Sequence, residues 1–175
     1  MPLHTRPATE DDLPALARLD KEVFADLAYP YFILRQFFDL CEDHALVLDD
    51  GHTLHGYVLA TSPCADVSWI LSLGITGNLQ GKGLGRQLMI AILGRLRSEK
   101  AHEVRLTVDP DNDRAVSLYQ RLGFTQAGDV RKDYFGPGEH RVLMTLDLAD
   151  SAAPAHETPP SAPSATPNSG PPAGP

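Results

Sequence analysis

The chain has 175 residues, and 42% of them are hydrophobic, which suits one globular domain of ordinary size. Lys and Arg number 15 against 23 Asp and Glu, and the net charge of −8 argues against broad nucleic-acid binding and favours attraction of cationic amines. The two cysteines, Cys41 and Cys64, belong to no CxxC or Cys/His cluster, so we expect neither a disulfide framework nor a bound metal.

Two features of the sequence bear on location and domain limits. No apolar run approaches the roughly 20 residues that span a bilayer, and the N-terminus has no signal-peptide pattern, so we expect a cytoplasmic protein without membrane association. Composition changes near Ala149, after which Pro, Ala, Ser and Thr dominate. We therefore predict a folded domain over residues 1–148 and a disordered Pro/Ala-rich tail over residues 149–175.

The first third of the chain predicts two helices and a β-hairpin. Thr9 and Asp12 match a capping box at the start of a helix whose apolar stripe continues to Phe24. A second helix is predicted over Tyr31–Cys41. Two strands joined by the turn signal Asp49-Asp50-Gly51 are predicted next, at Ala45–Leu48 and Leu54–Thr61.

The middle of the chain holds the clearest strand and the clearest helix. Every second residue of Val67–Ile75 is a large apolar one, which indicates a strand. After a glycine-rich loop, apolar residues recur every four positions from Leu84 to Leu96, as on a core-facing helix of about four turns. Another strand is predicted from Val104 to Val108.

The last predicted elements are a capped helix and a strand. Asp111 or Asn112 can cap a helix whose buried stripe includes Tyr119, and Gly123 suits a left-handed helix stop. A final strand is predicted over residues 142–148. The order β-α-α-β-β-β-α-β-α-β-β predicts a three-layer mixed α/β domain.

The glycine-rich loop, with Gly81, Gly83 and Gly85, joins the strand Val67–Ile75 to the helix that begins at Leu84. Glycines before a helix let the chain curl so that the free N–H groups of the first turn converge, and the helix dipole adds about half a positive charge there. Lys82 and Arg86 add local positive charge to an acidic protein. Together these features predict a site for a phosphate or pyrophosphate.

Two common phosphate loops fit poorly. A Walker A loop requires GxxxxGK[ST], and no Ser or Thr follows Lys82. A Rossmann fingerprint requires GxGxxG after the first strand, whereas this spacing is Gly81-x-Gly83-x-Gly85 after a later strand. A purely structural turn without a ligand remains the alternative.

Two segments resemble motifs of the GNAT superfamily of acyl-CoA-dependent N-acyltransferases. Gln80-Gly81-Lys82-Gly83-Leu84-Gly85 resembles the Q/R-x-x-G-x-G/A signature. Residues 112–119, NDRAVSLY, with Leu122-Gly123-Phe124, resemble the N-x-x-A-x-x-L-Y…L-G-F segment. The likeness covers about residues 3–148, and its C-terminal half most resembles ribosomal-protein alanine N-acetyltransferases.

The resemblance implies a sheet with splayed central strands and acetyl-CoA, or another acyl-CoA, as co-substrate. The loop amides would hold the pyrophosphate, backbone left unpaired by the splay would hold the pantetheine arm, and one of those amides would polarise the thioester carbonyl. The implied cofactor-binding positions are Leu73, Gly74, Ile75, Gln80, Gly81, Lys82, Gly83, Leu84, Gly85, Arg86 and Asn112.

The resemblance also implies a catalytic acid and no metal. Tyr119 matches the family tyrosine that protonates the departing thiolate. The amine attacks the thioester directly, so Cys64 need not be a nucleophile. Tyr119 can otherwise be a plain core aromatic. Asn112 can be a plain helix cap, a role that is compatible with binding the cofactor.

The general base is left unassigned. The ribosomal-protein enzymes carry a catalytic Glu on the strand before the Asn helix, and Thr107 stands at that position here. The remaining candidates are Asp109, Glu22, Asp133 and His140, or a chain of water molecules from backbone carbonyls.

The resemblance implies an acceptor site between the first helix pair and the loop joining the last two strands. Candidate contacts are Tyr29, Tyr31, Phe32, Tyr134 and His140. We predict an N-acetyltransferase acting on a primary amine, with a peptide or protein N-terminus ranked above a small amine. A catalytically inactive acyl-CoA-binding sensor or interaction module is the alternative. Many relatives dimerise, so a homodimer stays open.

Overall fold

The computed structural model describes residues 2–148. Four α-helices are found: α1 (Leu13–Phe24), α2 (Tyr31–Cys41), α3 (Leu84–Ser98) and α4 (Asp113–Arg121). Seven strands are found: β1 (His4–Pro7), β2 (Ala45–Asp49), β3 (Leu54–Ala60), β4 (Val67–Ile75), β5 (Glu103–Val108), β6 (Thr125–Gln126) and β7 (Val142–Asp147). Short 3-10 turns aside, this is the order predicted from the sequence, and α2 and β4 have the predicted bounds.

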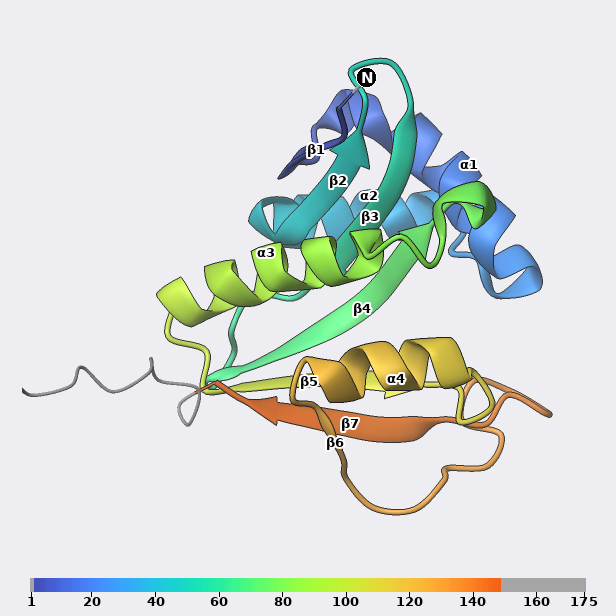
Figure 1. Ribbon diagram of the computed structural model, residues 1–175, viewed down its shortest axis with the longest axis vertical. Helices are drawn as coiled ribbons and strands as arrows, with labels where there is room; N and C mark the ends of the chain where they lie inside the picture. The colour runs from blue at the N-terminus through green and yellow to red at the C-terminus, as the bar shows by residue number, and fades with distance from the viewer. Residues whose placement is uncertain (1, 149–175) are drawn as a thin grey trace, which may run out of the picture.

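The strands form one mixed sheet in the order β1-β2-β3-β4-β5-β7-β6. Only the central pair, β4 with β5, is parallel, and it is paired only from Val67↔Glu103 to Trp69↔Arg105. Beyond Trp69 the two strands diverge, as Figure 1 shows. The predicted splay of the central strands is therefore confirmed.

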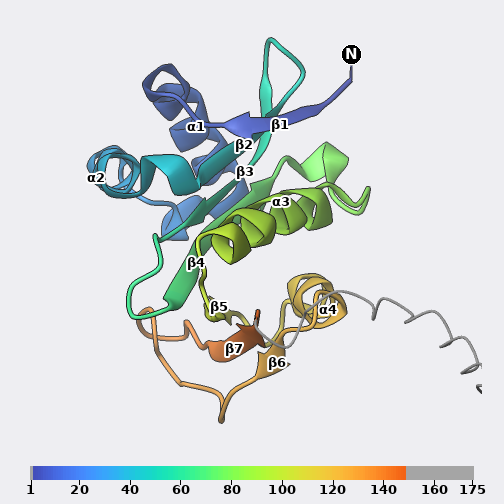
Figure 2. The same ribbon diagram turned by 90° about the vertical axis from the view of Figure 1, so that its left-hand side faces the viewer.

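The helices lie in two layers. Figure 2 shows α1 and α2 on one side of the sheet and α3 and α4 on the other. The core is divided accordingly: Leu88 and Ile92 of α3 belong to a cluster with β5 and β7, whereas Leu16 of α1 and Phe38 of α2 belong to a second cluster with Tyr57 of β3. The apolar stripes of these helices specify the three layers.

Strand β4 contains a β-bulge at the point where the sheet opens. Leu59 pairs with Ser72 and Ala60 with Ile70, so Leu71 is the extra residue. A bulge bends a strand and increases its twist, which accounts for the divergence from β5. The buried residues on β4 include Ser68, Ile70, Ser72 and Gly74, whereas most of the larger apolar residues between them are only partly buried. The alternation predicted the strand, but the bulge at Leu71 switches the side-chain direction: Ile70 belongs to the cluster with α3, whereas Ser72 and Gly74 contact Tyr57.

Helix boundaries follow the local signals. Thr9 donates its N–H to Oδ2 of Asp12 at 2.7 Å, which forms the predicted capping box, and a 3-10 turn over Glu10–Asp12 precedes α1. Asn112, not Asp111, caps α4 by accepting the N–H of Ala115 at 3.1 Å. Gly123 has a φ of +94°, as expected for a left-handed helix stop.

Some sequence predictions lie partly outside residues 2–148. The tail predicted over residues 149–175 lies outside the described residues. Among the helices that are described, none is both long enough and apolar enough to cross a bilayer. Within the same residues, no three His, Cys, Asp or Glu side chains gather as a metal site would require.

Candidate active site

The glycine-rich loop presents backbone amides to open space. Gly83 caps α3 with a φ of +82°, and Gly81 has a φ of +79°. The N–H of Gln87 reaches the carbonyl of Gly83 at 3.0 Å, so the N–H groups of residues 84–86 come before the first intrahelical bond. A Cβ added at Gly81 or Gly83 would meet no atom within 4 Å. This cradle fits a pyrophosphate.

Gly85 differs from the other two glycines. It lies inside the first turn of α3, where an added Cβ would touch Leu118 of α4 at 3.5 Å and Leu73 of β4 at 3.8 Å. These are ordinary contact distances. Gly85 therefore marks the place where α3, α4 and β4 meet, whereas Gly81 and Gly83 supply the left-handed backbone of the loop.

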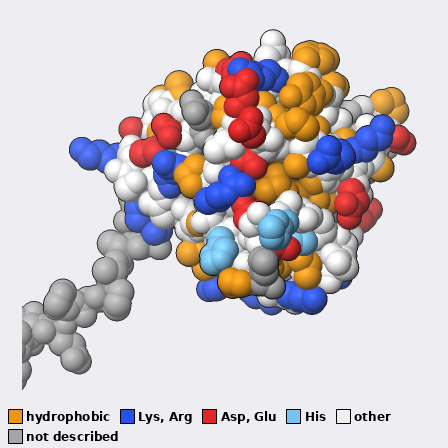
Figure 3. All heavy atoms as spheres, turned by 90° about the horizontal axis from the view of Figure 1, so that it is seen from above, with side chains coloured by type: hydrophobic (Ala, Val, Ile, Leu, Met, Phe, Trp, Pro, Cys, Tyr) orange, Lys and Arg blue, Asp and Glu red, His pale blue; other side chains and the backbone are white. Residues whose placement is uncertain are grey.

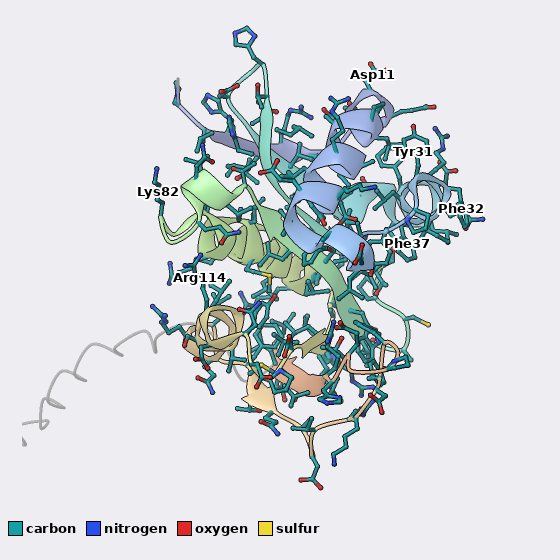
Figure 4. All side chains as sticks on the ribbon, turned by 90° about the vertical axis from the view of Figure 1, so that its right-hand side faces the viewer. Asp11, Tyr31, Phe32, Phe37, Lys82 and Arg114 are labelled. Atoms are coloured by element: carbon teal, nitrogen blue, oxygen red, sulfur yellow. The ribbon has the colours of Figure 1, made fainter. Side chains whose placement is uncertain are left out.

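The glycine-rich loop and the first turn of α3 carry two cationic side chains. Lys82 and Arg86 are exposed, and the first turn of α3 carries no acidic residue. Figure 4 shows Lys82 and Arg114 on the same side of the molecule, away from Tyr31 and Phe32 on α2. The local charge is thus positive at the amide cradle, which favours an anion there.

The gap between β4 and β5 exposes backbone groups of alternate residues. Thr76 donates its N–H to the carbonyl of His55 at 2.9 Å, so by the alternation of an antiparallel ladder Gly74 also faces β3 while Leu73 and Ile75 face the gap. The unpaired backbone expected from the sequence therefore belongs to Leu73 and to the N–H of Ile75, and not to Gly74.

Gly74 has a packing role. A Cβ at this position would lie 2.6 Å from a ring carbon of Tyr57, so no larger residue fits without displacing the ring. Tyr57 is fully buried against β4 as a result.

Gln80 connects the two walls of the gap. Its Nε2 donates to the carbonyl of Ile75 at 3.0 Å, and its Oε1 accepts from Nη1 of Arg114 at 2.6 Å. The first bond fixes the end of β4 and the second fixes the start of α4. Gln80, predicted as a cofactor residue, thus acts on the shape of the gap through its side chain.

The surroundings of Tyr119 favour the protonated form of its phenol. Its side chain is 8% exposed and packs edge-on against Phe124, with ring centroids 5.9 Å apart. Burial raises the pKa of Tyr119 to about 12, so the phenol keeps its proton at neutral pH. Within residues 2–148 its hydroxyl makes no hydrogen bond.

The acceptor candidates divide into one anchored residue and several exposed ones. Tyr29 donates its hydroxyl to the carbonyl of Leu71 at 3.2 Å, so it lies against the bulge of β4. Tyr31 and Phe32 are exposed on the first turn of α2. Tyr134, in the long loop between β6 and β7, is 41% exposed and lies 5.4 Å from the guanidinium of Arg131.

His140 helps to hold the β6–β7 loop together. Its Nδ1 accepts the N–H of Asp133 at 3.1 Å, and Oδ1 of Asp133 accepts the N–H of Gly138 at 2.7 Å. Two of the candidate bases are therefore committed to this loop.

The other candidate bases, Asp109 and Glu22, lie in a turn and in a groove outside the gap. Asp109 accepts the N–H of Asp111 at 2.9 Å in the turn before α4. Glu22 lines a groove of about 580 Å³ between α1 and the β2–β3 hairpin, together with Arg18 and His52. Acidic and basic side chains are mixed over this end of the molecule (Figure 3). Among the residues that the structure describes, none of these carboxylates accepts a hydrogen bond from the backbone of Leu73 or Ile75.

Sequence reasoning missed a buried polar cluster next to the bulge. Asp20 of α1 is fully buried, and hydrogen bonds connect it to Tyr57, which is in turn 2.8 Å from Ser72. The available signal was the position of Asp20, four residues after Leu16 on the apolar stripe of α1. Arg114 was also missed, since its contact with Gln80 depends on tertiary structure.

Comparisons with known proteins agree with this geometry. The model of the acetyltransferase (GNAT) family matches residues 11–124. The N-alpha-acetyltransferase RimI of Mycobacterium tuberculosis is 28% identical over 147 residues, which cover 81% of this chain and 90% of that protein. The mycothiol acetyltransferase of Paenarthrobacter aurescens is 41% identical over 64 residues, covering 37% of this chain. The chain spans only 20% of that relative's length.

Solved structures share the fold. The ribosomal-protein-S18-alanine N-acetyltransferase of Escherichia coli superposes with a TM-score of 0.71 at 20% identity, over 89% of this chain and 97% of that one. YncA of Salmonella typhimurium, solved with acetyl-CoA, gives a TM-score of 0.72 at 20% identity, over 89% and 99% of the two chains.

Proposed function

This chain belongs to the acetyltransferase (GNAT) family, and we propose that it transfers an acetyl group from acetyl-CoA to a primary amine. The observation that carries the proposal is the amide cradle at residues 81–86, which opens beside the unpaired backbone of β4. The buried, protonated Tyr119 belongs to the hydrophobic cluster against which Leu73 of β4 and Leu84 of α3 pack. We also propose a cytoplasmic location, as expected for an enzyme that uses this donor.

The donor would lie along the gap. The N–H groups of residues 84–86, with Lys82 and Arg86, would bind the pyrophosphate. The backbone of Leu73 and the N–H of Ile75 would bind the pantetheine arm as an added strand does. The side-chain amide N–H of Asn112 remains for the donor, because only its Oδ1 is used in capping α4. YncA, which has the same fold, binds acetyl-CoA. Another acyl-CoA would meet the same backbone groups.

Two groups of this chain would lower the barrier. The N–H of Leu73 faces the gap, where it can stabilise the negative charge that develops on the thioester oxygen. Tyr119 can donate its proton to the departing thiolate, because its raised pKa keeps it protonated. Direct attack by the amine needs no covalent enzyme intermediate.

The acceptor we favour is the N-terminus of a peptide or protein. Exposed aromatic residues on α2 and on the β6–β7 loop offer an open surface to a chain rather than an enclosed pocket. The relative RimI and the Escherichia coli structural neighbour both carry N-terminal or alanine N-acetylation in their names. A small amine is the second choice within the same reaction.

The test is a thiol-release assay with acetyl-CoA and a panel of amines. Unblocked peptides should release CoA, whereas the same peptides with an acetylated N-terminus and no lysine should not. Release with small diamines only would correct the acceptor class. Binding of acetyl-CoA without release for any amine would contradict the proposed transfer and support a binding module, for which the Thr107 position gives the sequence argument.

A further inference from the structure

A buried chain of hydrogen bonds runs from β4 to α1 beside the bulge. Ser72 Oγ lies 2.8 Å from the hydroxyl of Tyr57, and Tyr57 donates a hydrogen bond to Oδ1 of Asp20. The other oxygen of Asp20 accepts the N–H of Tyr29 at 2.6 Å. Asp20 and Tyr57 are fully buried, and Ser72 is 9% exposed.

In this series of hydrogen bonds, each hydroxyl proton is directed toward Asp20. Tyr57 has a single hydroxyl proton, and it is directed to Asp20. Ser72 must therefore donate to the oxygen of Tyr57, and the lone pairs of Ser72 remain free to accept a proton from outside. Burial, and then the nearby Asp20, raise the pKa of Tyr57, so its phenol stays protonated.

The buried Asp20 side chain has hydrogen-bond partners but no cationic partner among the described residues. Within residues 2–148 no Lys, Arg or His nitrogen forms an ion pair with this fully buried carboxylate. Burying a charge without a cation is costly, even where two hydrogen bonds compensate in part. The only titratable groups shown to face Asp20 are Tyr57, from β3, and Tyr29, from the segment before α2, and neither carries positive charge.

Ser72, the open end of this hydrogen-bonded chain, is one residue away from the backbone that faces the gap. Ser72 comes immediately after the bulge at Leu71 and immediately before Leu73, whose backbone faces the gap. Its side chain lies on the α1–α2 side of the sheet, with Tyr57, whereas α3 and α4 cover the donor side. Tyr29 approaches the same bulge by its bond to the Leu71 carbonyl.

We propose that Ser72, Tyr57 and Asp20 form a proton relay that takes the proton from the acceptor ammonium before attack. This inference rests on the proposed transfer to an amine. Ser72 would contact the amine and accept its proton while passing its own to Tyr57, and Tyr57 would pass its proton to Asp20. The N–H bond breaks, the Asp20 carboxyl gains one proton, and Ser72 and Tyr57 are each left with a proton. Tyr57 and Asp20 are positioning residues, since they act through Ser72.

The relay supplies the base for which sequence reasoning found no residue. Thr107 occupies the position where the ribosomal-protein enzymes carry Glu, Asp109 and Asp133 accept backbone N–H groups, and Glu22 lines the groove beside α1. The relay would act from β4 and α1, on the other side of the gap from the strand that carries Thr107. It differs from those candidates because its carboxylate never touches the substrate.

The test is the pH profile of Ser72→Ala measured against Ser68→Ala. Ser68 is a matched control because it is a buried serine of the same strand, and its hydroxyl has no hydrogen-bond partner among the described residues. An unblocked peptide has an α-amine with a pKa near 8, about one-tenth of which is neutral at pH 7. We therefore expect Ser72→Ala to lower kcat/KM about tenfold at pH 7, and the loss to disappear by about pH 9.

Ser68→Ala should keep the wild-type profile. A loss in Ser72→Ala that is the same at every pH, or no loss relative to Ser68→Ala, would overturn the relay and leave the acetyl transfer intact. Absence of thiol release by the wild type would instead contradict the proposed function itself.

A second variant covers the case in which Ser72→Ala does not fold. Tyr57→Phe keeps the ring that packs on Gly74 but removes the hydroxyl that joins Ser72 to Asp20. It should show the same loss at pH 7 and the same recovery at high pH, with unchanged acetyl-CoA affinity. A wild-type profile in this variant would equally overturn the relay.

Discussion

Arg114 on α4 donates a hydrogen bond to Gln80 at 2.6 Å, and Gln80 in turn binds the Ile75 carbonyl of β4 at 3.0 Å. The strand and the helix on either side of the gap are thereby joined through one side chain. We expect Gln80→Leu, which keeps the size but removes both bonds, to raise the KM for acetyl-CoA several-fold with a smaller change in kcat.

The control for this prediction is Gln87→Leu. Gln87 is an exposed glutamine of α3 whose Nε2 bonds Thr5 at 3.0 Å, away from the gap. Steady-state kinetics should show wild-type KM for the control. Equal KM values for the two variants would mean that the Gln80 bonds do not shape the donor site.

Tyr119→Phe should separate catalysis from binding. The ring and its packing on Phe124 are kept, whereas the proton donor is lost. We expect kcat to fall about a hundredfold, within the usual range for a general acid, and the Kd for acetyl-CoA to stay within about twofold. Because burial raises the pKa of Tyr119 to about 12, the wild-type rate should show no loss from its ionisation between pH 7 and 10. An unchanged kcat in the variant would remove its role as an acid.

Much of this arrangement follows from local sequence signals. The apolar stripes of α1 and α3 and the alternation of β4 specify their own elements, and the glycine pattern before α3 indicates an anion site. These signals depend only on neighbours within a few positions. The element order and the glycine loop could therefore be predicted.

What could not be predicted depends on strand register and long-range contacts. The bulge at Leu71 decides which residues of β4 face α1, and it turns Gly74 from a backbone ligand into a packing position. The contact of Asp20 with Tyr57 joins residues 37 positions apart. A charged residue on the apolar stripe of α1 was the only local signal of that cluster.

Tyr134→Ala tests the acceptor surface. If this side chain contacts a peptide, its loss should raise the KM for the peptide about tenfold, equivalent to about 1.4 kcal/mol, and leave the KM for acetyl-CoA unchanged. Leu40→Ala is a suitable control, because Leu40 is an apolar residue of α2 that is 76% exposed. A peptide KM that matches the control would place the acceptor elsewhere.

The pH dependence of stability should reveal the ion pair at the start of α1. Arg6 donates to both oxygens of Asp12, at 2.7 and 2.9 Å, and this bond lowers the pKa of Asp12 to about 2. A lowered pKa contributes stability that is present above about pH 4 and is lost as the pH falls through about 2. Because Arg6 is partly exposed, the contribution should be about 1 kcal/mol or less.

Urea unfolding between pH 5 and pH 2 measures this contribution. Asp12→Asn should lose less stability than the wild type over that range, and Asp11→Asn should follow the wild type because Asp11 makes no ion pair within residues 2–148. If the free energy of unfolding fell equally with pH in both variants, the Arg6–Asp12 bond would make no measurable contribution to stability.

The most direct test of the donor site is calorimetric titration of acetyl-CoA into the wild type, Gly83→Val and Gly51→Val. Gly51 is the matched control: its φ is +91°, an added Cβ meets nothing within 4 Å, and it lies in the β2–β3 hairpin. Both substitutions should cost about 1–2 kcal/mol of stability through backbone strain. Saturable binding by the wild type and Gly51→Val, with at least tenfold weaker binding by Gly83→Val, is the expected result. No heat from the folded wild type, or equal affinity in all three proteins, would contradict the assignment of residues 81–86 as the pyrophosphate site.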